Sequence, residues 1–262
     1  MYQNFLVFIR KAWHAHALYW SNDETQQSAK RSCVVLSPHP DDETIGMGAT
    51  IARKINSGSR VVLVVATDGR YSQESELITQ EKLIEIRKNE LNQAASILGI
   101  SKSDIFFVDE IDTKINDSRL EEKFNEIIDS LDFVPEEIMS TSWFDGHQDH
   151  QACAKIAKKV AEERSIVFRA CPIYWWAQGP SRSHREKHSV LNRQLGKVLD
   201  LKRAFLERGI KVDAKEFSDK RKDALKCYES QISNISNEEN WDTLDSDWLA
   251  TFDRRSEFFI RQ

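Results

Sequence analysis

Apolar and polar residues follow two alternating patterns along the first two thirds of the chain. Short runs rich in Val, Ile and Leu, of which residues 60–66 are the clearest, are nearly unbroken, as in strands that are buried on both faces. Longer segments between them, such as residues 81–98, carry apolar side chains every three or four positions and predict amphipathic helices. The predicted strands are residues 32–37, 60–66, 104–108, 137–140 and 166–176, and the predicted helices are residues 42–55, 81–98, 120–131, 150–164 and 217–231.

This order of strands and helices predicts the fold class. Strands separated by helices form βαβ units, which place the strands in one mostly parallel sheet with helices on both faces. We therefore expect an α/β protein with a Rossmann-like, three-layer αβα architecture. Ligands of such proteins bind beyond the carboxyl ends of the strands, so we expect the active site at that edge.

No internal repeat and no linker rich in Gly, Ser or Pro divides the chain. Residues 32–233 are therefore predicted to form one domain. Residues 1–31 are predicted as an N-terminal extension that is helical, and residues 234–262 as a C-terminal tail that packs on the domain.

Composition narrows the range of partners and compartments. The net charge of −5 comes without a basic stripe, which argues against binding to nucleic acid. No apolar run approaches the roughly 18 residues that span a bilayer, so no transmembrane segment is predicted. The four cysteines are widely spaced and form no CxxC motif, as is typical of reduced thiols, and we expect a cytoplasmic protein. The sequence predicts no oligomeric state.

The first cluster of reactive residues follows the first predicted strand and begins a predicted helix. It reads Pro-His-Pro-Asp-Asp-Glu over residues 38–43. Carboxylates at a helix N-terminus are stabilised in their ionised form by the helix dipole, and capping alone would explain Asp41 or Asp42. Capping does not explain His39, which lies between two prolines that restrict the backbone on either side.

A second cluster follows the predicted strand 137–140 and again begins a helix. It contains His147, Asp149 and His150. Because the carboxyl ends of parallel strands lie at one edge of a sheet, we expect the two clusters to lie close together. Two histidines and one aspartate would supply three ligands and leave a position open for water, as in a catalytic zinc site. A polar cluster that holds no metal is the alternative.

Together, residues 37–43 (SPHPDDE) and 147–150 (HQDH) resemble the PIG-L/LmbE-like family of zinc-dependent N-deacetylases, and residues 67–69 (TDG) and 87–90 (RKNE) agree with it. The resemblance implies that the metal is bound by three of these residues, with Zn²⁺ expected and other divalent transition metals acceptable. In this family pattern, His39, Asp42 and His150 would bind the metal and Asp41 would be the general base. His147 would stabilise the oxyanion or protonate the leaving amine, and Asp149 would pair with His147 and tune its charge.

The activity implied is removal of an N-acyl group, with N-acetyl as the expected case, from an amino sugar or glycoconjugate. A divalent metal lowers the pKa of a bound water to about 7, and the carboxylate of Asp41 can accept its proton. Two alternatives stay open at this point. One is metal-dependent hydrolysis of another bond, such as a phosphoester. The other is a non-catalytic module that binds sugar or metal.

Three further residues are weighed for roles near the substrate. Arg87 could hold a polar or anionic part of the substrate, or form a surface ion pair with a neighbouring glutamate. Asp68 could bind a sugar hydroxyl, or cap the turn at Gly69. Tyr228 stands where the family commonly has a histidine, and the resemblance gives it no role.

Overall fold

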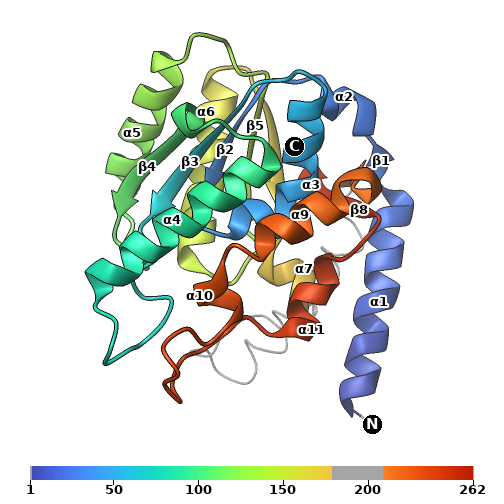
Figure 1. The fold of residues 1–262 in the computed structure, drawn as a ribbon. Coiled ribbons are helices and arrows are strands. Elements are labelled where there is room, and N and C mark those ends of the chain that lie inside the picture. The colour runs from blue at the N-terminus through green and yellow to red at the C-terminus, as the bar shows by residue number, and fades with distance from the viewer. Residues whose placement is uncertain (1, 179–208, 262) are drawn as a thin grey trace, which may run out of the picture.

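The structure is a computed structural model that describes residues 2–178 and 209–261. Eight strands form one sheet in the order β1-β7-β8-β6-β5-β2-β3-β4, and every neighbouring pair is parallel except the two that contain β8 (Figure 1). The predicted mostly parallel α/β sheet is therefore confirmed. The strands are β1 (Asn22–Asp23), β2 (Cys33–Ser37), β3 (Val61–Thr67), β4 (Ile105–Glu110), β5 (Glu137–Thr141), β6 (Val167–Cys171), β7 (Gly209–Asp213) and β8 (Ser256–Arg261).

Helices cover both faces of this sheet. In Figure 1 the helices α4 and α9 lie side by side over one face, and α5 and α6 lie on the other. The described helices of at least four residues are α1 (Tyr2–Trp20), α2 (Thr25–Ala29), α3 (Asp42–Asn56), α4 (Gln80–Leu98), α5 (Asp117–Ser130), α6 (Gln148–Glu163), α7 (Tyr174–Gln178), α9 (Ser218–Leu225), α10 (Glu229–Ile232) and α11 (Ser246–Leu249).

Alternate side chains of the inner strands divide the core into two layers. In β2, Val35 packs in one cluster with residues of α3, α4 and α9, whereas Val34 and Leu36 pack in a second cluster with residues of α1, α5 and α6. The unbroken apolar runs are explained in this way, because both faces of the strands are buried. The three-layer αβα arrangement is confirmed.

The predicted strand 166–176 is too long. The strand β6 ends at Cys171, and Tyr174–Gln178 forms the helix α7. Pro172 has no N–H to continue the strand pairing. The carboxylate of Asp145 then accepts hydrogen bonds from the N–H groups of Ile173 (3.0 Å) and Trp175 (2.9 Å), and so it caps the new helix.

The predicted helix 217–231 is divided into α9 and α10. Residues 226–228, which form turns, separate the two helices. Just beyond the break, the backbone N–H of Ser230 donates to the carboxylate of Glu90 (2.7 Å) on α4. A bond to a distant helix therefore replaces a local one.

The segments set apart in the sequence as an extension and a tail share the central sheet. Residues 1–31 contain α1 and α2, and they also supply β1, which pairs with β7. Residues 234–262 supply β8, which lies between β6 and β7. No helix within residues 2–178 and 209–261 combines the length and the apolar character that crossing a lipid bilayer requires.

A buried ion pair joins α3 to β5. The ammonium of Lys54 lies 2.5 Å from the carboxylate of Glu137, and both side chains are fully buried. Removing one member of a buried pair leaves the other uncompensated, which costs about 3–5 kcal/mol. Because Arg31 and Arg169 also flank Glu137, we expect Lys54→Met to lower the free energy of unfolding by about 3 kcal/mol, the lower end of that range.

Urea unfolding followed by circular dichroism measures this loss. The matched control is Lys82→Met, because Lys82 pairs with Glu85 on the surface of α4, where both side chains are more than half exposed. The control should unfold at the same urea concentration as the unchanged protein. Equal midpoints for the two variants would show that the buried pair contributes no stability.

The order of the inner strands places a crevice at one edge of the sheet. The strand β2 has β3 on one side and β5 on the other. The chain leaves β2 towards β3 and leaves β5 towards β6, so the connections run in opposite directions. The loops after β2 and β5 therefore diverge and leave room for a ligand between them.

Candidate active site

The two sequence clusters meet at this crevice. His39 follows β2, Asp42 begins α3, and His150 lies in the first turn of α6. The Oδ2 atom of Asp42 lies 3.1 Å from Nδ1 of His39 and 3.2 Å from Nε2 of His150. The three residues predicted as metal ligands thus converge on one carboxylate oxygen.

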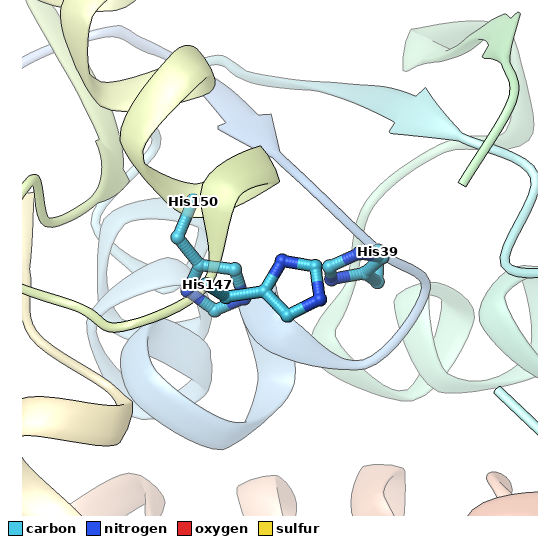
Figure 2. Close-up of side chains that lie close together, drawn as sticks. All are labelled: His39, His147 and His150. Atoms are coloured by element: carbon cyan, nitrogen blue, oxygen red, sulfur yellow. The ribbon is translucent and has the colours of Figure 1, made fainter. Parts of the chain in front are cut away.

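His147 lies at the N-terminus of α6, beside the other two imidazoles (Figure 2). One ring nitrogen of each of His39, His147 and His150 lies within 4.8 Å of the other two. His147 is therefore close enough to serve either as a ligand or as a group that contacts the substrate.

Carboxylates lie beside the second ring nitrogen of both His39 and His150, the one that does not face Asp42. The Nε2 atom of His39 lies 3.3 Å from both Asp112 and Asp149, and Nδ1 of His150 lies 2.9 Å from Asp145. Metal-binding histidines commonly donate their second ring N–H to such a carboxylate, which fixes the ring. Asp112 and Asp145 were not predicted, although Asp112 follows the predicted strand 104–108 and so reaches the same sheet edge.

The electrostatics of the cluster favour a positive charge. Burial alone would lower the pKa of His39 and of His150. The carboxylates of Asp112, Asp149 and Asp42 nevertheless raise the pKa of His39 well above its usual value. The carboxylates beside His150 likewise raise its pKa to about 9 against the effect of burial.

One nitrogen atom among the predicted metal ligands, the buried Nε2 of His150, has no hydrogen-bond partner among the residues that the structure describes, although the oxygen of Asp42 lies close to it. Two imidazoles and one carboxylate are ligands that Zn²⁺ and related divalent ions accept. The residues present therefore fit a divalent metal.

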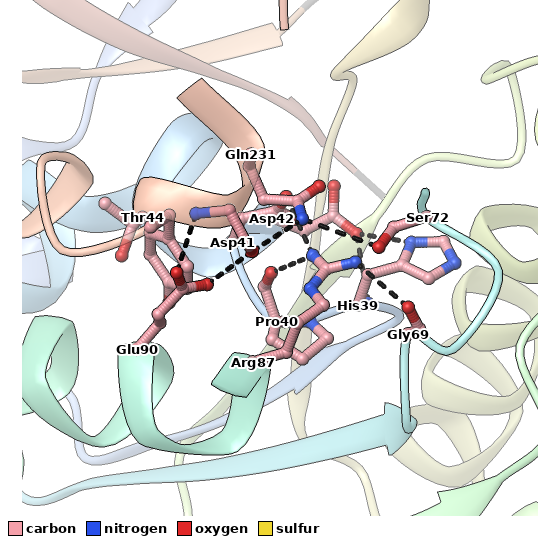
Figure 3. A network of polar contacts seen from close by, with 12 residues as sticks. His39, Pro40, Asp41, Asp42, Thr44, Gly69, Ser72, Arg87, Glu90 and Gln231 are labelled. Atoms are coloured by element: carbon pink, nitrogen blue, oxygen red, sulfur yellow. Dashed lines mark hydrogen bonds and ion pairs between the residues drawn. The ribbon is translucent and has the colours of Figure 1, made fainter. Parts of the chain in front are cut away.

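Asp41 lies beside the cluster in an unusual backbone conformation. Its φ of +140° is one that residues with a side chain rarely adopt. Its carboxylate is 3.0 Å from the guanidinium of Arg87 (Figure 3). Burial raises the pKa of Asp41 to about 7, and the cation of Arg87 opposes the shift. A carboxyl group with a pKa near 7 can take up and release a proton at neutral pH.

The two candidate substrate-binding residues differ in their surroundings. Arg87 is 2% exposed, so it is not the surface ion pair considered above. It lines the pocket, but its guanidinium donates to Asp41 and to the carbonyl of Pro40 (Figure 3). Asp68 accepts hydrogen bonds from the backbone and the side chain of Arg70 and does not line this pocket, which agrees with the turn-capping alternative.

Asp149 does not pair with His147 through its side chain as expected. Its carboxylate faces His39 and accepts a hydrogen bond from the N–H of Thr113 (2.7 Å), whereas its own backbone N–H donates to Nδ1 of His147 (3.2 Å). Burial and the neighbouring charges of His39 and His150 lower the pKa of His147 to about 4, and Asp149 opposes this only in part. His147 is therefore neutral at pH 7, and not cationic as the expected pairing with Asp149 would make it.

These residues line a pocket of about 280 Å³. One wall comes from parts of the chain that the sequence motifs do not include, namely α7 and the residues around α11. The lining side chains are those of His39, Asp41, Asp42, Ile45, Tyr71, Ser72, Gln73, Arg87, Asp112, Thr113, His147, Tyr174, Gln231, Asp242, Thr243, Leu244 and Trp248.

Comparison with known proteins agrees with the motifs. Residues 34–161 match the family model PIG-L, described as GlcNAc-PI de-N-acetylase, and this match confirms the resemblance over that part of the chain. A diacetylchitobiose deacetylase of Thermococcus kodakarensis is 30% identical over 123 residues, which cover 46% of this chain and 45% of that protein. The chain thus spans about half the length of this curated relative.

Solved structures share the fold over a longer range. An N,N'-diacetylchitobiose deacetylase of Pyrococcus horikoshii superposes with a TM-score of 0.62 at 19% identity, covering 91% of this chain and 86% of that one. The 4-carboxy-2-hydroxymuconate hydratase of Pseudomonas putida superposes with a TM-score of 0.55 at 19% identity, covering 84% and 83%. One fold thus carries different reactions, so the activity has to be argued from the site.

Proposed function

We propose that the protein is a metal-dependent hydrolase that removes N-acyl groups, N-acetyl first among them, from amino sugars or glycoconjugates. The observation that supports this most directly is the convergence of His39, Asp42 and His150 beside the carboxylate of Asp41 at the pocket. A metal site with an adjacent proton acceptor is the arrangement that hydrolysis of an unreactive bond needs.

In this proposal His39, Asp42 and His150 hold the metal, which is Zn²⁺ or a related divalent ion. A metal held there would act as a Lewis acid: it would lower the pKa of a nearby water, so that the water loses a proton more readily, and would polarise the acyl carbonyl. The carboxylate of Asp41 accepts the proton of the attacking water, because its pKa of about 7 allows both protonation states near neutrality. The guanidinium of Arg87, on α4, forms an ion pair with that carboxylate and holds it in place.

His147 provides a hydrogen bond to the oxygen that becomes negative during attack. Its Nδ1 atom accepts a hydrogen bond from the N–H of Asp149, so in the neutral ring the proton is on Nε2. A neutral imidazole with a fixed tautomer is a donor that needs no reorganisation when charge develops. Asp149 is then a residue that orients His39 and His147, by its carboxylate and its N–H respectively.

The substrate class rests on the relatives and on the lining of the pocket. The curated relative described above is named as a diacetylchitobiose deacetylase, and the matched family model, described as GlcNAc-PI de-N-acetylase, spans residues 34–161, which contain both clusters of reactive residues. The side chains of Gln73, Gln231 and Asp112 in the pocket wall are hydrogen-bonding groups suited to sugar hydroxyls, and Tyr174 and Trp248 add aromatic surface. Arg87 contributes to the wall, whereas Asp68 is left out of the proposed binding residues.

The test is release of free amine from a panel of N-acetylated sugars, including N-acetylglucosamine and diacetylchitobiose, before and after removal of metal with a chelator. Amine release that stops with the chelator and returns with Zn²⁺ supports the proposal. Release of phosphate from p-nitrophenyl phosphate with no amine release would favour phosphoester hydrolysis. Metal binding without turnover of any of these substrates would favour a non-catalytic module.

A further inference from the structure

The backbone at Asp41 requires support from outside its own loop. A φ of +140° at a residue with a side chain is strained, and such strain persists only where the surroundings hold it in place. Arg87 holds the side chain of Asp41 and the preceding carbonyl of Pro40 (Figure 3). The backbone N–H of Asp41 is held separately, by the carboxylate of Glu43 (3.2 Å).

Glu43 is fully buried and binds partners in two directions. Its Oε2 accepts from the N–H of Asp41, and its Oε1 accepts from the hydroxyls of Thr44 (2.6 Å) and Tyr228. The Tyr228 hydroxyl is the one of these donors that comes from a distant part of the chain, between α9 and α10. One carboxylate therefore links the strained peptide at Asp41 to Tyr228.

Tyr228 is itself fixed. Its side chain is fully buried and does not line the pocket. Two residues later the hydroxyl and the N–H of Ser230 both donate to Glu90 (2.7 Å each), which lies on α4 together with Arg87. The segment that carries Tyr228 is thus tied to the same helix that holds the side chain of Asp41.

We propose that Tyr228, acting through Glu43, is a positioning residue that holds the backbone of Asp41 in the conformation from which its side chain lines the pocket beside His39 and Asp42. Arg87 fixes the side chain and the Tyr228–Glu43 pair fixes the peptide, so the two act on different atoms of one residue. The catalytic meaning of this positioning rests on the function proposed above, but the positioning itself does not.

The variant Tyr228→Phe keeps the buried ring and removes the hydroxyl. We expect hydrogen exchange at the amide of Asp41, followed in peptides that span residues 38–45, to become at least about fivefold faster because its acceptor is less firmly held. We expect kcat for amide hydrolysis to fall about tenfold, with KM within about twofold and the metal content unchanged, as for an interaction that matters in the transition state.

Two further variants separate positioning from general loosening. Trp241→Phe removes another buried hydrogen bond of the same segment, from the indole N–H to the carbonyl of Ser230 (3.0 Å), and leaves the hydrogen bonds of Glu43 to Asp41, Thr44 and Tyr228 in place. It should change neither the exchange at Asp41 nor kcat. In a Glu43→Ala background, Tyr228→Phe should lower kcat by less than about twofold, because the route to Asp41 is already lost.

The proposal is overturned if Tyr228→Phe leaves both the exchange at Asp41 and kcat unchanged, or if Trp241→Phe has the same effects. It is also overturned if the effects of Tyr228→Phe and Glu43→Ala simply multiply. A wild-type protein that hydrolyses no N-acetylated sugar contradicts the proposed function alone. The exchange measurement would then still decide whether Tyr228 positions Asp41.

Discussion

Replacing Asp41 by Asn is expected to lower the turnover of an N-acetylated sugar by about 100- to 10,000-fold, the range that a general base typically contributes. The amide keeps the size and the hydrogen-bonding reach of the carboxylate but cannot accept the proton of the attacking water. Because Asp41 is not among the residues assigned to the metal, the metal content should stay the same. Turnover is measured by amine release, and metal content by elemental analysis of the purified variant.

A matched control removes a carboxylate of the same kind away from the site. Asp109 lies at the end of β4, pairs with Lys88 and has a half-exposed side chain. Asp109→Asn should therefore leave turnover within about twofold, as expected for an exposed pair. If Asp41→Asn also stays within a few-fold of the unchanged protein, Asp41 is not the general base.

Replacing His150 by Ala is expected to abolish tight metal binding and, with it, activity. His150 is fully buried, and its Nε2 atom faces the oxygen of Asp42 that also faces His39. Removing one of three ligands leaves two, which is fewer than known catalytic zinc sites use. Metal content after dialysis and activity with added Zn²⁺ measure the two effects.

The variant His147→Ala distinguishes the two roles that the geometry allows for His147. It should keep the metal and lose most of the turnover, because the hydrogen bond to the developing oxyanion is lost, an effect of about 100- to 1,000-fold. Loss of metal in His147→Ala with full occupancy in His150→Ala would reverse the assignment, since the ring nitrogens of all three histidines lie within reach of one ion.

The core of this site could be predicted from sequence because its reactive residues are adjacent in the chain. His39, Asp41 and Asp42 fall within a window of four residues that follows one strand. His147 and His150 fall within a second window of four residues that follows another strand. Asp112 and Trp248 could not be found in this way, since each is a single residue whose place at the pocket depends on the order of the strands or on the course of a later segment. The sheet topology brings such residues together, and periodicity carries no information about it.

The strands and helices between residues 33 and 163 were predicted within a few residues, because each is long and strongly periodic and pairs with its neighbours in a repeated pattern. Later elements were predicted less well where tertiary contacts decide the local structure. The helix α7 begins where the carboxylate of Asp145 accepts N–H groups from the following loop. The break between α9 and α10 accompanies hydrogen bonds to Glu43 and Glu90. None of these partners is close in sequence.

The position of β8 sets the order in which the sheet can be assembled during synthesis. Among the described strands, β1 pairs with β7 alone, and β7 joins the remaining strands only through β8. A ribosome delivers β2 to β6 in an order that lets each find a neighbour already made. The strand β1 is made before all of them, yet it has no place in the sheet until residues 256–261 have left the exit tunnel. The earliest of the described strands to be synthesised is therefore among the last of them to be incorporated, and a chain that lacks β8 leaves that side of the sheet open to other partners.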